Sequence, residues 1–171
     1  MQRFHPSVVT LHWVMALLII IALLSGGYVP LNFHLISGLV ISALLVLRVV
    51  SRATTRKVQP PAGQGGLMTK AAHWMHLGLY GLVAVVVATG LGMAVQGNLF
   101  QVALGGGPLP VGFAESALHK AHALATQLLL IAVAGHALAA LWHQFIRRDH
   151  LFSRMWFARG RDRNAINNSH A

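Results

Sequence analysis

Four long runs of apolar residues dominate this sequence and limit what it can fold into. They lie at about residues 9–28, 33–53, 69–95 and 116–146, and each is close to or longer than the ~20 residues that a helix needs to cross a bilayer. Of the 171 residues, 56% are hydrophobic and only 9% are charged, whereas about a quarter of an average soluble domain is charged. The sequence therefore predicts an all-α integral membrane four-helix bundle, a single domain over residues 1–171.

The first run has an alternative interpretation as a secretory signal, because Arg3 precedes an apolar core that ends in Ser25-Gly26-Gly27. A histidine within the run, His12, is unusual for a cleaved signal. We therefore interpret the run as the first membrane span. A later apolar run, residues 99–104, is too short to span and is expected to lie flat on the outer surface.

Positive charge gathers on one side of the predicted bundle. With four spans both termini share a side, and twelve of the thirteen Lys and Arg residues fall there, while Lys120 alone lies near the other side. Because Lys and Arg collect in cytoplasmic loops, both termini are predicted to be cytoplasmic, in a bacterial inner membrane. The net charge of +10 is then a topological signal and indicates membrane lipid as a partner, with no nucleic acid.

The histidines form two ladders of matching depth. Eleven His accompany three acidic residues, and most lie in or near the spans, where ionisable groups are costly. His122 and His136 are 14 residues apart, which returns to within about 40° of one helix face and separates them by about 21 Å. In the first hairpin His34 lies near the outer turn and His12 about 20 Å deeper. His34 is thus expected to meet His122 near the outside, and His12 to meet His136 near the cytoplasm.

Two stacked pairs of imidazoles predict a membrane cytochrome with two b-type haems. Neutral imidazole is a common axial ligand of haem iron, and cofactor sites of helical bundles are built between facing helices. The chain has no Cys, which excludes iron–sulfur centres and thiolate-ligated haem. Bare Zn or Cu sites are the weaker alternative, since two His at one level leave such ions short of ligands. For any single His, a hydrogen bond between helices is the simpler interpretation.

Several neighbours of the four histidines are candidate site residues. Arg48, at the cytoplasmic end of the second span, is placed to pair with a propionate of the inner haem. An alternative of equal weight is that Arg48 only extends its charged end to the membrane interface. Lys120 offers the same role at the outer haem. Gly38 and Gly135 are consistent with clearance for the ring or with close helix packing.

A quinone and proton site is expected beyond the inner pair. His143 lies seven residues after His136, on nearly the same face and about 10 Å closer to the cytoplasm, so it is a candidate to line a quinone pocket and supply a proton. His76 is a candidate to share that pocket, whereas His73 fits an interfacial role. The remaining aromatic and histidine positions fit an interfacial belt or solvated ends: Trp13, Trp74, Trp142 and Trp156 for the belt, and His5, His150 and His170 for the ends.

The chain resembles the prokaryotic di-haem cytochrome b561 family over nearly its whole length. The resemblance is carried by the following motifs: Leu11-His12-Trp13, Phe33-His34 with Ser37-Gly38, Arg48 with Arg52, Ala72-His73-Trp74-Met75-His76, and His122, His136 and His143 at spacings of 14 and 7. It implies His12 and His136 as ligands of the cytoplasmic-side haem b, and His34 and His122 as ligands of the outer one. It also implies an oxidoreductase that oxidises superoxide at the periplasmic face and reduces ubiquinone near the cytoplasmic side.

Two hypotheses for the function share these haem ligands and differ in the electron donor. The first outer turn is shorter than the family pattern, and the outer face offers only Lys120 and His119, against Glu115, to attract an anion. A cytochrome b subunit that relays electrons between a periplasmic redox partner and the quinone pool would carry the same four His. A His-rich metal or haem transporter is a third class, and haem stoichiometry separates it from the other two.

Overall fold

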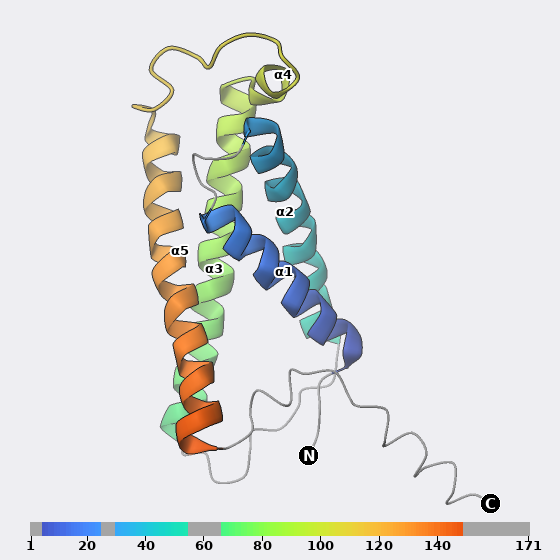
Figure 1. Ribbon diagram of the computed structural model, residues 1–171, viewed down its shortest axis with the longest axis vertical. Helices are drawn as coiled ribbons and strands as arrows, with labels where there is room; N and C mark the ends of the chain where they lie inside the picture. The colour runs from blue at the N-terminus through green and yellow to red at the C-terminus, as the bar shows by residue number, and fades with distance from the viewer. Residues whose placement is uncertain (1–4, 25–29, 55–65, 149–171) are drawn as a thin grey trace, which may run out of the picture.

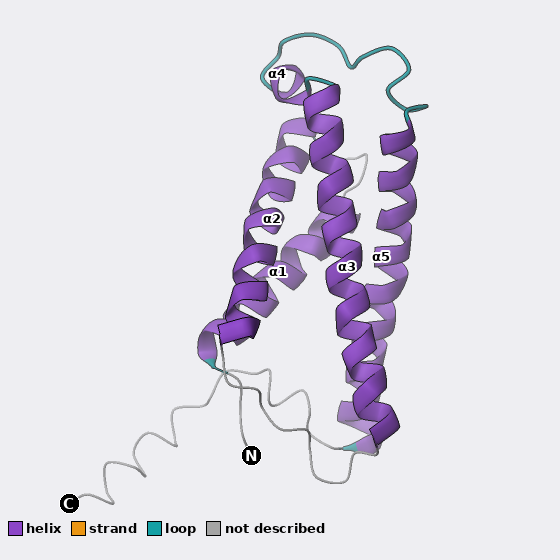
Figure 2. Ribbon diagram, turned by 180° about the vertical axis from the view of Figure 1, so that it is seen from behind, coloured by secondary structure: helices purple, strands orange, loops and turns teal. Residues whose placement is uncertain are grey.

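The computed structural model describes residues 5–24, 30–54 and 66–148. Four long helices, α1 (Pro6–Leu24), α2 (Leu31–Thr54), α3 (Gly66–Gln96) and α5 (Ala117–Trp142), account for most of them. A short helix, α4 (Leu99–Ala103), follows α3, and a π-helical turn, η1 (His143–Arg147), continues α5. No strand occurs in these described ranges (Figure 2). The all-α prediction is confirmed, and four helices are long and apolar enough to cross a membrane.

The helix starts are set by local capping. Helix α1 begins at Pro6, a residue that suits a first helical position because it lacks an N–H. The His5 carbonyl accepts from the N–H groups of Val8 and Val9, at 3.0 and 3.2 Å. Helix α5 begins at Ala117, and the Ser116 hydroxyl accepts from the His119 N–H at 3.2 Å, which satisfies one of the free donors of the first turn.

The four long helices run alternately up and down as two hairpins (Figure 1). Helix α3 packs most extensively against α5, α1 packs against α2, and α2 and α3 join the two hairpins. Neither α1 nor α2 packs its backbone closely against α5. Contact between the first hairpin and α5 therefore depends on side chains that reach across the bundle.

The two ends of the bundle differ in character. The basic end, where α1 begins and α5 finishes, carries Arg52, Lys70, Arg147 and Arg148. The opposite end, the α4 end, carries α4 and the loop that leads to α5 (Figures 1 and 2). The run 99–104 forms α4 there, and Leu99 is buried beside Met93 and Ala94 of α3. Its first residue is thus part of the protein core at this end.

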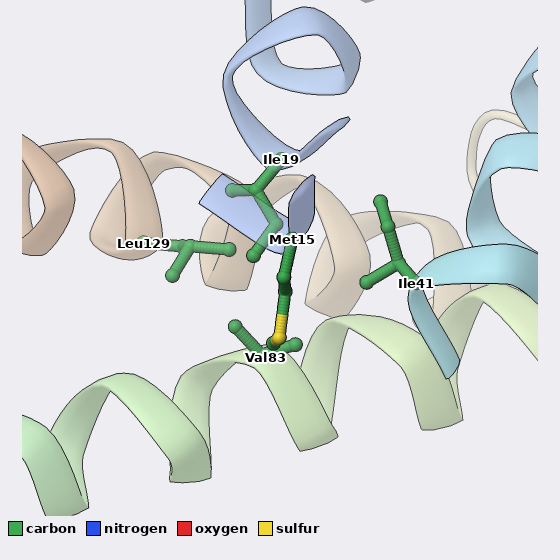
Figure 3. Packing of buried hydrophobic residues seen from close by; sticks show 5 residues of the cluster. All are labelled: Met15, Ile19, Ile41, Val83 and Leu129. Carbon is green, nitrogen blue, oxygen red and sulfur yellow. The ribbon is translucent and has the colours of Figure 1, made fainter. Parts of the chain in front are cut away.

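A layer of apolar side chains from all four long helices crosses the middle of the bundle. Residues seven apart share a helix face and lie about 10.5 Å apart along the axis. On α2, α3 and α5 such triplets place one core residue midway between two polar or small positions: His34, Ile41 and Arg48; His76, Val83 and Gly90; and His122, Leu129 and His136. The middle layer consists of Met15, Ile19, Ile41, Val83 and Leu129 (Figure 3). It separates a pair of histidines toward the α4 end from a pair toward the basic end.

Candidate functional site

The pair toward the α4 end joins α2 to α5. The rings of His34 and His122 have centroids 6.2 Å apart and planes at 83°. His34 lies in the first turn of α2 and His122 in the second turn of α5, so the two helix starts bring them to the same level. Both side chains are partly buried.

Helix α3 holds the His122 ring from the side. His122 Nδ1 lies 3.1 Å from the carbonyl oxygen of Val86 and 3.1 Å from Thr89 Oγ1. A carbonyl can only accept, so Nδ1 carries the proton, while the Thr89 hydroxyl directs its own hydrogen to the Val85 carbonyl at 2.8 Å. In this neutral ring Nε2 is therefore unprotonated, and its lone pair is available to bind a metal. Histidines that bind a metal through Nε2 commonly donate from Nδ1 in this way.

The pair toward the basic end joins α1 to α5. The rings of His12 and His136 have centroids 6.4 Å apart and planes at 75°. Both line a cavity of about 100 Å³ whose other walls are largely apolar. Those walls come from α1, α3 and α5 and include Met15, Ile19, Leu79, Val83, Leu129 and Val133.

The ring separations fit two imidazoles that share one metal atom between them. A metal–nitrogen distance of about 2 Å on each side, with about 1.2 Å from nitrogen to ring centre, gives a separation near 6.4 Å, against the 6.4 and 6.2 Å found. In the described ranges no group of three or more His, Cys, Asp or Glu is placed to hold a metal ion. A pair of imidazoles without further protein ligands would suit the iron of a haem, which brings its own macrocycle.

Arg48 ties the basic-end pair to two other helices. Its guanidinium lies 2.9 Å from His12 Nδ1, 3.1 Å from the Tyr80 hydroxyl and 3.4 Å from the Val8 carbonyl. Arginine has donors only, so all three groups accept from it. Among the described residues the one carboxylate, Glu115, lies at the α4 end. A partly buried cation without a counter-ion is costly, so the site suits an anionic group such as a haem carboxylate.

A family model described as prokaryotic cytochrome b561 matches residues 3–158. The chain belongs to this family. It is therefore a multi-pass membrane protein that binds haem b and transfers electrons. No curated protein matches the chain.

His76 lies in the basic-end cavity of this cytochrome b561. Its Nδ1 donates to the Ala72 carbonyl at 2.6 Å, and its ring centroid lies 5.2 Å from that of His136. His143, at the start of η1, contacts the ring of Trp142 with centroids 5.2 Å apart. His143 is not among the residues that line the cavity. His76 thus lies beside the His12/His136 pair within this cavity.

The remaining basic-end positions lie near the bundle surface. His73 is exposed and its ring lies 6.0 Å from that of Trp74, which is 65% exposed. Trp142 is 41% exposed. Both exposed Trp residues suit the predicted interfacial belt. His5 is exposed and caps α1, whereas His150, Trp156 and His170 lie outside the described residues.

The outer-face candidates lie at the start of α5. Lys120 and Glu115 are exposed, and the His119 ring lies 5.5 Å from that of Phe113. His119 and Lys120 precede His122 by three and two residues, so they are near the α4-end pair in sequence. Gly38 and Gly135 would bring an added Cβ within 4 Å of no described atom, so close helix packing does not explain either glycine.

Besides the backbone carbonyls of Val8 and Val86, three residues that contact the histidines or Arg48 were not predicted from the sequence. Tyr80 accepts from Arg48, Thr89 accepts from His122, and Gly90 lies against the His122 ring. The spacing of His76, Val83 and Gly90 by seven residues was a signal for Gly90, because it marks one face of α3 at the same three levels as α5. Thr89 and Tyr80 had no comparable signal.

Proposed function

We propose that this cytochrome b561 binds two haem b groups and carries electrons between them across the membrane. His34 and His122 ligate one haem, and His12 and His136 ligate the other. The observation that carries this proposal is the repetition of one geometry at two levels, with ring separations of 6.2 and 6.4 Å on either side of the middle layer. Haem supplies one-electron chemistry, and the bis-His ligation leaves no open position on iron, which suits electron transfer.

Arg48 has a different partner once the inner haem is bound. A neutral His12 that accepts at Nδ1 carries its proton on Nε2, and that nitrogen cannot then ligate iron. Ligation through Nε2 thus requires Arg48 to release His12, whose proton moves to Nδ1. A haem propionate offers Arg48 a stronger, charge-assisted hydrogen bond in place of the imidazole, and Arg48 keeps Tyr80 as its second partner.

Electrons move from the periplasmic α4 end to the cytoplasmic basic end. The charge distribution supports this orientation. At the outer face Lys120 and His119 attract superoxide, and two superoxide ions in succession each lose one electron and leave as oxygen for each ubiquinone that is reduced. At the inner face His76, in the cavity beside His136, supplies a proton to ubiquinone, which takes up two electrons and two protons on full reduction. His143 lies on the proton route from the cytoplasm.

A relay from a periplasmic protein partner is the second candidate. Apolar side chains are exposed in the loop that follows α4, where Leu104 is 89% exposed and Leu109 48%. An exposed apolar patch rimmed by polar groups is typical of a protein–protein contact, and Lys120 with His119 gives little attraction for a small anion. In this alternative the same four His ligate the same two haems.

Haem stoichiometry and single-turnover kinetics on the purified full chain test the proposal. We expect a b-type reduced-minus-oxidised spectrum with two haems per chain, fast haem reduction by a pulse of superoxide, and reoxidation by a short-chain ubiquinone. Slow reduction by superoxide with two haems present favours the relay. Absence of haem, or one haem per chain, contradicts the di-haem proposal.

A further inference from the structure

We propose that Thr89 and Gly90 of α3 are positioning residues for His122, although α3 supplies no ligand to that haem. They set the orientation of the His122 ring and its strength as an electron donor. The inference rests on the proposed role of His122 as an axial ligand. It assigns to α3 a role at the haem that His122 holds.

The hydrogen bonds define the tuning role of Thr89. His122 Nδ1–H is shared between the Val86 carbonyl and Thr89 Oγ1, each at 3.1 Å. Thr89 is kept in acceptor orientation, because its own hydrogen goes to the Val85 carbonyl at 2.8 Å. Acceptors on Nδ1–H make an imidazole a better donor through Nε2. A stronger donor stabilises ferric iron, so Thr89 holds the potential of the outer haem down.

Steric contact defines the role of Gly90. A Cβ added at Gly90 would lie 3.3 Å from His122 Cε1 and 3.6 Å from Nδ1. The first distance is tighter than ordinary van der Waals contact, so an alanine there requires the ring to shift by a few tenths of an ångström. Because Cε1 lies next to Nε2 in the ring, this shift turns the ring plane at the iron. Glycine therefore sets the ring orientation that the hydrogen bonds of Nδ1 hold.

The surroundings of His12 in the inner pair differ from those of His122, and the difference predicts which haem has the lower reduction potential. His12 Nδ1 lies beside the Arg48 guanidinium, and the Arg48 charge stays near the inner haem when its partner becomes a propionate. A cation near a haem favours the reduced state of iron, whereas neutral acceptors on the ligand favour the oxidised state. The two environments place the outer haem at lower potential than the inner one. Transfer from the α4 end to the basic end is then downhill.

Four variants of the full-length, haem-loaded chain test the inference. Thr89→Val removes one acceptor, Thr89→Ser keeps it, Gly90→Ala adds the close Cβ, and Gly81→Ala on the same helix is the control, since its Cβ meets nothing within 4 Å. The measurements are haem stoichiometry, redox titration of both haems, and the low-temperature electron paramagnetic resonance spectrum of the ferric state, whose g values report on the relative ring planes of the axial ligands.

For Thr89→Val we expect the reduction equilibrium of one haem to shift about three- to tenfold toward the ferrous form, where tenfold is ~59 mV for one electron. Thr89→Ser restores it. Gly90→Ala moves the g values of the same haem or releases that haem alone, and Gly81→Ala changes neither. Potentials and g values equal to those of wild type in both Thr89→Val and Gly90→Ala overturn the inference.

The haem content of His122→Ala tests the proposed function separately. If that variant keeps two haems, His122 is not a ligand and the di-haem assignment fails. If it loses one haem while Thr89→Val and Gly90→Ala match wild type, the ligand assignment stands and the positioning role falls. The two failures therefore have different signatures.

Discussion

The ring of His34 lies 6.2 Å from the ring of His122, although the backbones of α2 and α5 do not pack closely against each other. His12 and His136 span the bundle in the same way between α1 and α5, at 6.4 Å. Each pair thus links the first hairpin to α5, and any group held between two such rings also ties the hairpins together. Loss of a haem is therefore expected to loosen the bundle as well as to remove a redox centre.

Removal of one outer ligand tests this link directly. We expect His34→Ala to lose the outer haem, to keep the inner one, and to unfold at lower temperature than wild type in the same detergent. The reason is that a single remaining imidazole holds haem weakly and no longer joins α2 to α5. Pyridine haemochrome analysis counts the haems, and thermal unfolding followed by circular dichroism measures the stability.

His5→Ala is the control, since His5 is an exposed residue that caps α1 and belongs to neither pair. It is expected to keep two haems. Retention of two haems in His34→Ala would show that another residue supplies the ligand, and the pairing would then be wrong.

Arg48 is expected to set the potential of the inner haem. A full positive charge within about 10 Å of the iron, at an effective dielectric constant near 20, favours the reduced state by about 1–2 kcal/mol. Arg48→Met removes that charge and is expected to lower the inner potential, while Arg48→Lys retains most of it. Redox titration of both haems measures the change, and the outer potential is expected to stay constant.

Arg52→Met gives the matched control for charge at the same end of α2. Arg52 follows Arg48 by four residues and lies over the Tyr80 ring at 5.8 Å. An equal fall in the inner potential for Arg48→Met and Arg52→Met would show a general effect of surface charge and would contradict a specific role of Arg48.

The architecture was predictable because it depends on local regularities. Hydropathy located the four long helices to within a few residues, and the helical repeat placed His122 and His136 on one face at two levels. The proximity of His12 to His136 followed from counting along two helices joined by a short turn. The two rings lie 6.4 Å apart, although α1 runs obliquely across the bundle (Figure 1).

The contacts of α3 were not predictable from the sequence. Which face of α3 meets α5 depends on tertiary packing, so no local pattern indicated that Val86 and Thr89 would hydrogen-bond to the His122 ring. The seven-residue spacing of His76, Val83 and Gly90 indicated the level of Gly90 but not its contact with that ring. The same limit applies to Tyr80, whose hydroxyl meets an arginine 32 residues away in sequence. The sharing of one quinone pocket by His76 and His143 stays a prediction, and the structure places His76 in the cavity beside His136.

His76 is expected to act in proton supply without holding haem. His76→Gln keeps a polar side chain but cannot exchange a proton near neutral pH. We expect His76→Gln to keep two haems with the same His ligands and a normal rate of haem reduction from the outer side. Reoxidation of the haems by ubiquinone is expected to be at least tenfold slower. Stopped-flow absorbance at the haem band separates the two half-reactions.

His73→Gln is the control for this measurement, because His73 lies on the same helix and is exposed outside the cavity. Loss of one haem in His76→Gln would make His76 a ligand in place of His12. Equal reoxidation rates in the two variants would remove His76 from the proton route.

Leu129 tests whether the middle layer stabilises the bundle independently of the haems. Its side chain is 2% exposed and lies in the layer with Met15, Ile19, Ile41 and Val83 (Figure 3). In a soluble core Leu→Ala costs about 2–5 kcal/mol, but lipid is as apolar as leucine, so only the packing loss remains and the expected cost is about 1–3 kcal/mol. Leu130→Ala, one residue on and 46% exposed, faces away from the layer and is expected to cost far less. Equal thermal shifts of the two variants in detergent, with both haems retained, would mean that the layer separates the two histidine pairs without holding the helices together.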